Sequence, residues 1–467
     1  MINNLSSNLA LDEVRSAVAR LQGDIASGPI VPNVTPHEIR SYLASRYDFT
    51  KPVELDDVVA DVELMLRTWQ VQVTHPRYFG LFNPSVTLAS VVADTLVAMY
   101  NPQLATWRTS PAANEIERHT LAWLIGKFGL PASAAASFTT GGAESNLSAV
   151  IVALTRAFPD YHEAGLRRLS TAPTIYLTQE AHHGFEKIAH MTGIGRRALR
   201  KVATDRGLKM DLRDLARQVS ADRRDGYAPF MVVGTAGTTA AGVIDPLPDL
   251  ARFCRSEDLW FHVDAAWGGA AIISPRLRGH LTGIGDADSI TCDAHKWFSV
   301  PMGAGMFFCR HPNALAAAFR TETSVMPGET DGVSDPYSTS VQWSRRFIGL
   351  KLFMALAHRG ESGYFEMIEH QARMGDVLRK SLTRAGWQVV NTTPLPVVCF
   401  TRNGLVPAKF LATLHERQIA WMSEIRLGDG PPVVRACVTS FRTTEADIEW
   451  VVREMTRIAP AEAEAMA

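Results

Sequence analysis

The amino-acid sequence predicts an α/β protein with a mainly parallel central sheet, preceded by a helical N-terminal segment and followed by a small α+β unit. The chain has 467 residues, 46% of them hydrophobic, so it can bury a sizeable core and exceeds what one compact domain usually holds. In its middle part, short apolar runs alternate with amphipathic ones, a pattern typical of strands covered by helices on both faces. We therefore expect three domains, at residues 1–95, 96–345 and 346–467.

The N-terminal part is predicted to form helices and loops. Residues 56–70 (DDVVADVELMLRTWQ) have the apolar spacing of an amphipathic helix. A further helix is expected within residues 109–131, where Ser110 can cap its first turn and Gly129 can end it.

The central sheet is predicted from five apolar runs that suit strands buried on both faces. These runs are residues 174–178, 230–237, 259–266, 289–294 and 305–310. A helix is expected between two of them, at residues 247–257. The C-terminal unit is predicted to contain strands near 387–390, 395–400 and 432–438, and helices near 345–360, 408–418 and 445–459.

Composition excludes several classes of partner. The formal net charge is −1 and no block of like charge occurs, so neither a nucleic-acid surface nor a basic membrane patch is predicted. The N-terminus lacks the pattern of a signal peptide, and no apolar run is long enough to cross a bilayer. Five scattered cysteines without CxxC spacing indicate free thiols of a reducing cytoplasm, and no metal site is predicted.

A lysine between a histidine and a tryptophan, in the sequence DAHKW (293–297), is the first candidate for chemistry. An ordinary lysine at a strand end keeps its ammonium in water. Alternatively, Lys296 is a nucleophile, desolvated so that the pKa of its amine falls and it forms a Schiff base with an aldehyde. Lys296 by itself does not decide between the two.

Two further features lie near predicted strand ends, where open parallel sheets bind their ligands. The glycine pair in TTGGAESN (139–146) leads into a helix, and the N–H groups of such a turn can hold a phosphate. Asp264 ends an apolar strand and needs a cationic partner, such as a pyridinium nitrogen, with the small Ala266 leaving room for a flat ring. The alternative for the glycine pair is a simple loop, and the alternative for Asp264 is an aspartate that caps the next turn.

A histidine and two threonines follow two other strands. His182 in QEAHHG can stack on a ring, and Thr238 and Thr239 in GTAGTTAAGVIDP supply hydroxyl groups, although both residue types are common in purely structural roles. Together, a phosphate turn, a histidine, a hydroxyl, a carboxylate and a lysine describe a pyridoxal phosphate pocket. In this combination Lys296 is predicted to bind the aldehyde of the cofactor.

The residues HVDAAW (262–267) and DAHKW (293–297) resemble the motifs of the group II pyridoxal-phosphate-dependent amino-acid decarboxylases. That family includes aromatic amino-acid, glutamate and cysteine-sulfinate decarboxylases, and the likeness extends from residues 74–80 to 432–438. It implies a type I aminotransferase-like fold and a homodimer with active sites at the subunit interface. The helical N-terminal segment would wrap the partner subunit.

The resemblance also implies a role for each site residue. Lys296 binds the cofactor, Asp264 pairs with its ring nitrogen, His182 stacks on one ring face with Ala266 on the other, and Thr239 lies near the ring oxygen. Lys296, His182 and Asp264 are the expected catalytic residues.

The phosphate and the substrate have their own expected partners. Gly142, Ala143 and His295 are implied to hold the phosphate. At Asp293 many relatives carry asparagine, so this residue is expected to act through its backbone or through a shared proton. Arg435 matches an arginine that faces the substrate carboxylate, and the alternative is a surface arginine.

Two departures from the family pattern bear on the reaction. Leu81 stands where relatives with acidic substrates carry a polar residue; together with Phe82 and Trp107 it predicts an apolar or aromatic substrate side chain, although core packing explains any one of them equally well. Val325 stands where relatives usually have a tyrosine that returns a proton to the substrate carbon, a task that Tyr337 or His182 could take over.

The leading hypothesis is decarboxylation of an L-amino acid to its amine and carbon dioxide. One alternative is decarboxylation coupled to oxidative deamination, which gives an aldehyde and which Val325 motivates. The others are a transaminase or desulfurase with the same lysine, and a non-catalytic pyridoxal-binding protein.

Overall fold

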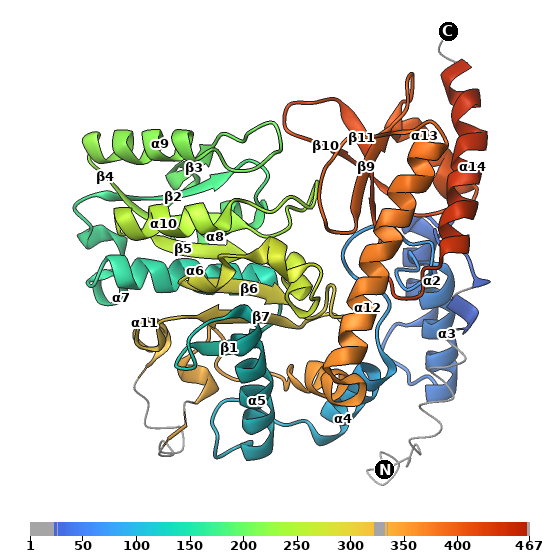
Figure 1. Ribbon diagram of the computed structural model, residues 1–467. Coiled ribbons are helices and arrows are strands. Elements are labelled where there is room, and N and C mark those ends of the chain that lie inside the picture. Colours follow the sequence, from blue (N-terminus) through green and yellow to red (C-terminus); the bar gives the residue numbers. More distant parts are fainter. Residues whose placement is uncertain (1–22, 26, 322–331, 334, 465–467) are drawn as a thin grey trace.

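A computed structural model describes residues 23–25, 27–321, 332–333 and 335–464 (Figure 1). It contains a seven-stranded sheet of order β1-β7-β6-β5-β4-β2-β3. The strands are β1 (Ala135–Thr139), β2 (Ala172–Thr178), β3 (Leu199–Val202), β4 (Tyr227–Thr235), β5 (Trp260–Asp264), β6 (Ser289–Asp293) and β7 (Gly305–Cys309). Neighbours from β6 to β3 are parallel, whereas β7 is antiparallel to both β6 and β1. The predicted mainly parallel sheet is confirmed.

Helices cover both faces of this sheet. The cluster that includes Val150, Ile188 and Leu315 packs α6, α8 and α11 on one face. The cluster that includes Leu124, Leu215 and Leu250 packs α5, α9 and α10 on the other. The helices are α5 (Pro111–Phe128), α6 (Gly142–Ala157), α7 (Tyr161–Ala164), α8 (Gly184–Met191), α9 (Leu212–Arg224), α10 (Leu247–Glu257) and α11 (Pro312–Phe319). Short 3₁₀ turns are η1 (Leu166–Arg168), η2 (Arg196–Ala198), η3 (Gly268–Ile273), η4 (Arg278–Leu281), η5 (Ile284–Asp286) and η6 (Pro336–Ser338).

A second sheet follows the long helix α12 (Leu350–Arg384), which runs beside the large sheet toward the small one in Figure 1 and is bent at Gly360. This sheet is antiparallel, of order β10-β11-β9-β8. Its strands are β8 (Gln388–Val389), β9 (Val397–Thr401), β10 (Ser423–Arg426) and β11 (Pro432–Cys437), and its helices are α13 (Pro407–Glu416) and α14 (Glu445–Glu464).

The N-terminal part contains α2 (Pro36–Arg46), α3 (Leu55–Thr68) and α4 (Leu88–Tyr100). Neither α2 nor α3 buries any residue. They are joined to each other through Asp61, which accepts hydrogen bonds from Tyr42, Arg46 and Tyr47 at 2.9, 2.6 and 2.6 Å.

Three local predictions need correction. Ser110 occupies the N-cap position of α5, but its hydroxyl donates to the Gln103 carbonyl at 2.8 Å instead of capping the helix. The predicted helix at 345–360 starts only at Leu350, because Glu117 accepts hydrogen bonds from Arg345 and from the Gly349 backbone at 2.9 Å each. Three strands, β1, β3 and β10, were not predicted.

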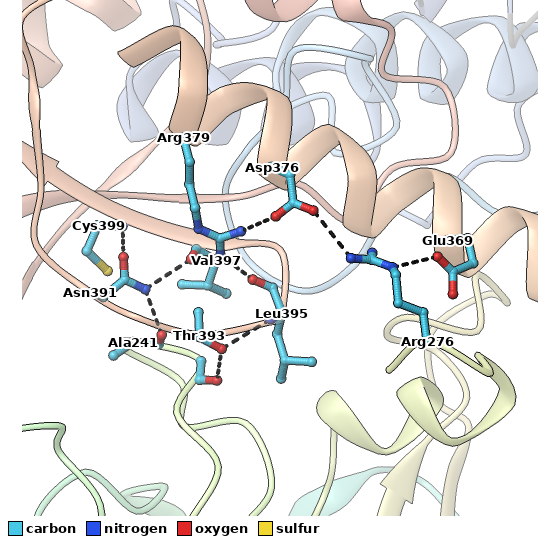
Figure 2. Close-up of polar contacts among 11 residues, drawn as sticks. Ala241, Arg276, Glu369, Asp376, Arg379, Asn391, Thr393, Leu395, Val397 and Cys399 are labelled. Atoms are coloured by element: carbon cyan, nitrogen blue, oxygen red, sulfur yellow. Dashed lines mark hydrogen bonds and ion pairs between the residues drawn. The ribbon is translucent and has the colours of Figure 1, made fainter. Parts of the chain in front are cut away.

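The small sheet holds the loop that follows β4 (Figure 2). The Asn391 amide donates to the Ala241 carbonyl at 2.8 Å and accepts from the Cys399 N–H at 2.8 Å. Thr393 donates its hydroxyl to the Gly242 carbonyl at 2.5 Å. The loop between β4 and α10 therefore has a fixed position relative to the small sheet.

Arg276, between η3 and η4, connects that segment to α12 beside this contact (Figure 2). Its guanidinium lies 2.8 Å from Glu369 and 3.4 Å from Asp376, both on α12. All five cysteines are buried free thiols. Among the described helices, none has the length and apolar character needed to cross a membrane.

Candidate active site

The predicted site residues leave the sheet at one edge. Asp264 ends β5, Asp293 ends β6, and the loops after β2 and β4 carry His182 and Thr239. Because β1 and β6 are both antiparallel to β7, β1 points the same way as β6, and Gly142 after it lies at the same edge. This is the carboxyl edge of the parallel strands, where open α/β sheets bind ligands.

Lys296 forms an ion pair in this structure. Its Nζ lies 3.0 Å from Asp293 Oδ2, and 22% of its side chain is exposed. Burial alone would lower the pKa of this amine, but the negative charges of Asp293 and Asp264 outweigh burial and raise it. The predicted fall in the pKa of Lys296 is therefore wrong for this structure, and the amine is an ammonium.

Asp264 is a buried hydrogen-bond acceptor with 5% exposure. Its Oδ1 accepts from the Ala266 N–H at 3.1 Å, and its Oδ2 accepts from the Asn146 side-chain amide at 2.9 Å. Asn146 comes from α6, which crosses the end of the strand. The carboxylate is thus fixed in orientation by two donors.

A chain of hydrogen bonds continues from Asn146 into the sheet. Asn146 Oδ1 lies 3.0 Å from His262 Nε2, and His262 Nδ1 lies 2.9 Å from Ser289 Oγ. Trp260 Nε1 donates to the same Ser289 Oγ at 2.8 Å. Burial lowers the pKa of His262 to about 4, so the ring is neutral and donates from Nε2.

The roles of Asn146 and His262 were not predicted, although both residues lie in the motifs quoted above. A signal was present, because Trp260, His262 and Asp264 alternate along β5 and so share one face of the strand. Polar side chains on a buried face of a strand need hydrogen-bond partners. This face of β5 therefore required a polar residue on the helix that covers it.

The glycine turn packs against the lysine segment. A Cβ on Gly142 would lie 2.9 Å from Asp293 Oδ2 and 3.2 Å from the Ala266 Cβ, and one on Gly141 would lie 3.3 Å from His295 Cε1. The N-terminus of α6 therefore opens toward Asp293 and His295, and only glycine leaves space there. Backbone N–H groups at such a helix end favour an anion.

His295 and His182 are both neutral donors. Burial lowers the pKa of each ring, and the charge of Lys296 lowers it further while nearby carboxylates oppose the shift. His295 Nδ1 accepts from the Ala304 N–H at 3.2 Å, and His182 Nδ1 accepts from the Gly184 N–H at 3.0 Å. In each ring Nε2 then carries the proton.

Only one of the two candidate threonine hydroxyls stays exposed. Thr238 is fully buried, and its Oγ1 accepts from the Val243 N–H at 3.1 Å. Thr239 is exposed, so its hydroxyl is the one of the pair that can meet a ligand.

Arg435 lies against a group of packed aromatic rings. It is 2% exposed, so it is not a surface arginine, and its guanidinium carbon lies 4.8 Å from the centre of the Phe82 ring. Phe82 stacks on Trp267 at 4.4 Å, and Trp267 lies 5.7 Å from Trp297. Within the described residues, Nε and Nη2 of Arg435 have no hydrogen-bond partner. Buried unpaired donors of this kind suit an anionic ligand.

Other predicted substrate residues have different surroundings. Leu81 is 53% exposed. Trp107 donates its Nε1–H to Glu115 at 3.0 Å and its backbone N–H to Asp335 at 2.7 Å, contacts that do not reach the stack at Arg435. Val325 lies outside the described residues. Tyr337 is buried with its ring 5.0 Å from that of Trp343.

A family model named "Pyridoxal-dependent decarboxylase conserved domain" matches residues 36–403. An aromatic-L-amino-acid decarboxylase of Bacillus atrophaeus is 28% identical over 404 residues, covering 83% of this chain and 82% of that protein. A 4-hydroxyphenylacetaldehyde synthase of Rhodiola rosea is 28% identical over 421 residues, covering 86% and 84%. An acidic amino acid decarboxylase of Xenopus tropicalis is 30% identical over 339 residues, covering 71% and 66%.

The fold has close counterparts among solved structures. The crystal structure of Catharanthus roseus tryptophan decarboxylase in complex with L-tryptophan superposes with a TM-score of 0.87, at 24% identity, covering 98% of this chain and 100% of that one. The predicted type I fold is confirmed by this likeness.

Proposed function

The chain belongs to the family of pyridoxal-dependent decarboxylases, and from that membership we propose that it removes the α-carboxyl group of an L-amino acid with an apolar or aromatic side chain. The enzyme class, a lyase that uses pyridoxal phosphate, follows from the family. The substrate class rests on one observation: the guanidinium of Arg435 lies on the Phe82 ring, which in turn stacks on Trp267. Its Nη1 donates to Ser423 Oγ at 3.4 Å, and its Nε and Nη2 have no partner among the described residues.

The residues present fit the cofactor. The glycine turn leaves room at the N-terminus of α6, where a Cβ on Gly142 would lie only 2.9 Å from Asp293 Oδ2. The Asp264 carboxylate accepts hydrogen bonds from two donors, which fix its orientation. When bound, pyridoxal phosphate supplies an electron-withdrawing ring that accepts the electron pair of the breaking bond. Thr239 would contact the ring oxygen.

Each residue of the pocket has a task that its position supports. Lys296 would hold the aldehyde carbon through Nζ and later return a proton to the substrate amine. Asp264 would keep a proton on the ring nitrogen through its carboxylate, which Asn146 and Ala266 orient. His182 would cover the ring face opposite Ala266 and donate from Nε2, the nitrogen left protonated by the Gly184 contact.

The phosphate and the substrate carboxylate would be bound by different residues. Gly142, Ala143 and His295 would receive the phosphate at the start of α6, where helix N–H groups favour an anion. Arg435 would hold the substrate carboxylate through Nε and Nη2, and the Phe82 and Trp267 rings would exclude water around it. Exclusion of water strengthens this charge-assisted contact.

A second product is the specific alternative. Similarity to a 4-hydroxyphenylacetaldehyde synthase and the presence of Val325 in the sequence favour release of an aldehyde, ammonia and hydrogen peroxide, with molecular oxygen as the oxidant. The similarity to an acidic amino acid decarboxylase favours a substrate with an acidic side chain. The apolar surroundings of Arg435 do not support such a substrate.

The product assay decides between these reactions. We expect purified protein loaded with pyridoxal phosphate to release carbon dioxide from L-phenylalanine, L-tyrosine or L-tryptophan, and to leave L-glutamate unchanged. If the reaction lacks a proton donor because position 325 is a valine, aldehyde and peroxide form in air. In that case Val325→Tyr raises the ratio of amine to aldehyde. Carbon dioxide release from L-glutamate alone would contradict the proposed substrate class.

The same molecule is proposed to act as a homodimer. Apolar side chains are exposed along the N-terminal helices, with Leu55 72% exposed on α3 and Met99 and Tyr100 70% and 82% exposed at the end of α4. Helices that bury no residue, such as α2 and α3, have little packing to stabilise them. We therefore propose that a second copy of the chain covers their exposed apolar side chains.

Sedimentation equilibrium is expected to give twice the mass of one chain. Met99→Asp should weaken this association, because a charge at a covered apolar position must lose its water. Val390→Asp, at an exposed position after β8, is the matched control and should leave the mass unchanged. A monomeric wild-type protein at micromolar concentration would contradict the dimer.

A further inference from the structure

Asp293 places a second negative group where the phosphate is proposed to bind. Its side chain is 1% exposed, and its Oδ2 lies 3.0 Å from Lys296 Nζ and 3.7 Å from His295 Nε2. Its Oδ1 has no hydrogen-bond partner among the described residues. A buried carboxylate held by one ammonium has little to replace that partner if the ammonium is used elsewhere.

The carboxylate faces the turn that begins α6. A Cβ on Gly142 would lie 2.9 Å from Asp293 Oδ2, so no side chain separates the carboxylate from the first N–H groups of the helix. The same helix end favours any anion. A phosphate dianion at this turn would therefore sit beside the Asp293 carboxylate in a pocket with little water, where like charges repel strongly.

The other titratable groups that face Asp293 do not supply a compensating positive charge. His295 on the same loop and His182 on the loop after β2 are neutral, since burial lowers the pKa of each. Burial raises the pKa of the Cys292 thiol, which is therefore uncharged. Asp264 on β5 adds a further negative charge near Lys296. Lys296 is the positive group paired with Asp293, and it is the group that the cofactor needs. Lys351 on α12 also acts on His295, but its Nζ lies 3.7 Å from the Asp94 carboxylate.

We propose that Asp293 couples loading of the cofactor to uptake of one proton from solvent: it is ionised and paired with Lys296 in the empty pocket, and it becomes a neutral carboxyl group when a phosphate ester binds at the start of α6. This inference rests on the proposed phosphate site. The protonated carboxyl group then donates a hydrogen bond where the ionised one would repel the phosphate. Cofactor affinity consequently decreases as the pH rises.

Pyridoxine 5′-phosphate is the probe for this coupling, because it has no aldehyde to react with Lys296 and therefore tests the effect of the phosphate alone. Titration calorimetry at pH 7.5, in two buffers of different ionisation enthalpy, counts the protons taken up. We expect about one proton for the wild type and none for Asp293→Asn, which keeps the size of the side chain and loses its charge. At this pH the phosphate is already a dianion in both experiments.

The pH dependence of the wild type provides a second measurement that needs no variant. The ratio of the affinities for pyridoxine 5′-phosphate and for pyridoxine is expected to fall about tenfold per pH unit between pH 7 and 9, as linkage to one proton requires. Pyridoxine lacks the phosphate, so its own affinity serves as the control.

Three outcomes would overturn the inference. These are equal proton uptake by the wild type and Asp293→Asn, an affinity ratio that does not change with pH, and an absence of phosphate-dependent binding by the wild type. No amino acid is present in these titrations, so a proton-coupled protein that releases no carbon dioxide would contradict the proposed reaction while leaving the role of Asp293 intact.

Discussion

Lys296→Ala is expected to abolish borohydride-stable attachment of pyridoxal phosphate and to reduce carbon dioxide release by a factor of at least about 10² to 10⁴, the contribution of a positioned proton-transfer group alone. The amine lies at the carboxyl edge of the sheet, between Asp293 and Asp264, whose charges raise its pKa. The variant removes both the nucleophile and the ammonium that neutralises Asp293.

The measurement is absorbance of the loaded protein followed by borohydride reduction and peptide mapping. Wild type should carry the label on Lys296 alone. Lys187→Ala is the matched control, since this exposed lysine lies on α8, shortly after His182, and should leave both label and activity unchanged. A stable label at a single other position in Lys296→Ala would show that a different amine binds the aldehyde.

The positions of Lys296 and Asp264 could be predicted from the sequence because each lies at or just after the end of a predicted strand, whereas Gly142 was found from its glycine pair alone. Parallel strands with helical connections bring these ends to one edge of the sheet, whatever the details of packing. Short apolar runs were enough to find β2 and β4 to β7. By contrast, β1 (AASFT) and β3 (LRKV) have few β-branched residues, and their strand character depends on pairing with β7 and β2.

The charge state of Lys296 could not be predicted in the same way. Desolvation lowers the pKa of a lysine, and that part of the expectation was sound. The opposing effect depends on a turn in which the Lys296 N–H bonds to the Asp293 carbonyl at 3.3 Å, bringing the two side chains together. Adjacent polar residues in a sequence do not reveal such a turn.

The partners of Asp264 and Arg435 depend on contacts between distant segments. Asn146 reaches Asp264 because one face of α6 crosses the end of β5, although the two residues are 118 positions apart in the sequence. Phe82 reaches Arg435 because the Phe79 carbonyl accepts from the Cys437 N–H at 2.8 Å, which joins the N-terminal segment to β11. Tertiary packing alone decides these neighbours.

Asp264→Ala is expected to fold, to bind pyridoxal phosphate weakly and to show almost no turnover. The ring nitrogen loses the carboxylate that keeps it protonated, so the cofactor loses its capacity to accept electrons. Removing the acceptor also leaves the buried Asn146 amide without its partner, which should destabilise the protein by about 1–3 kcal/mol. Thermal unfolding, cofactor titration and carbon dioxide release measure the three effects separately.

Asp264→Asn separates charge from hydrogen bonding at the same position. Its amide oxygen can still accept from Asn146, while its NH2 group faces the Ala266 N–H, so the loss of thermal stability should be smaller than in Asp264→Ala and turnover should fall as far as in that variant. Loss of stability without loss of turnover in the two variants would show that Asp264 only supports α6. If both variants lose turnover equally and severely, and the alanine variant loses more stability, catalysis depends on the negative charge and folding depends on the hydrogen bond that Asn146 donates.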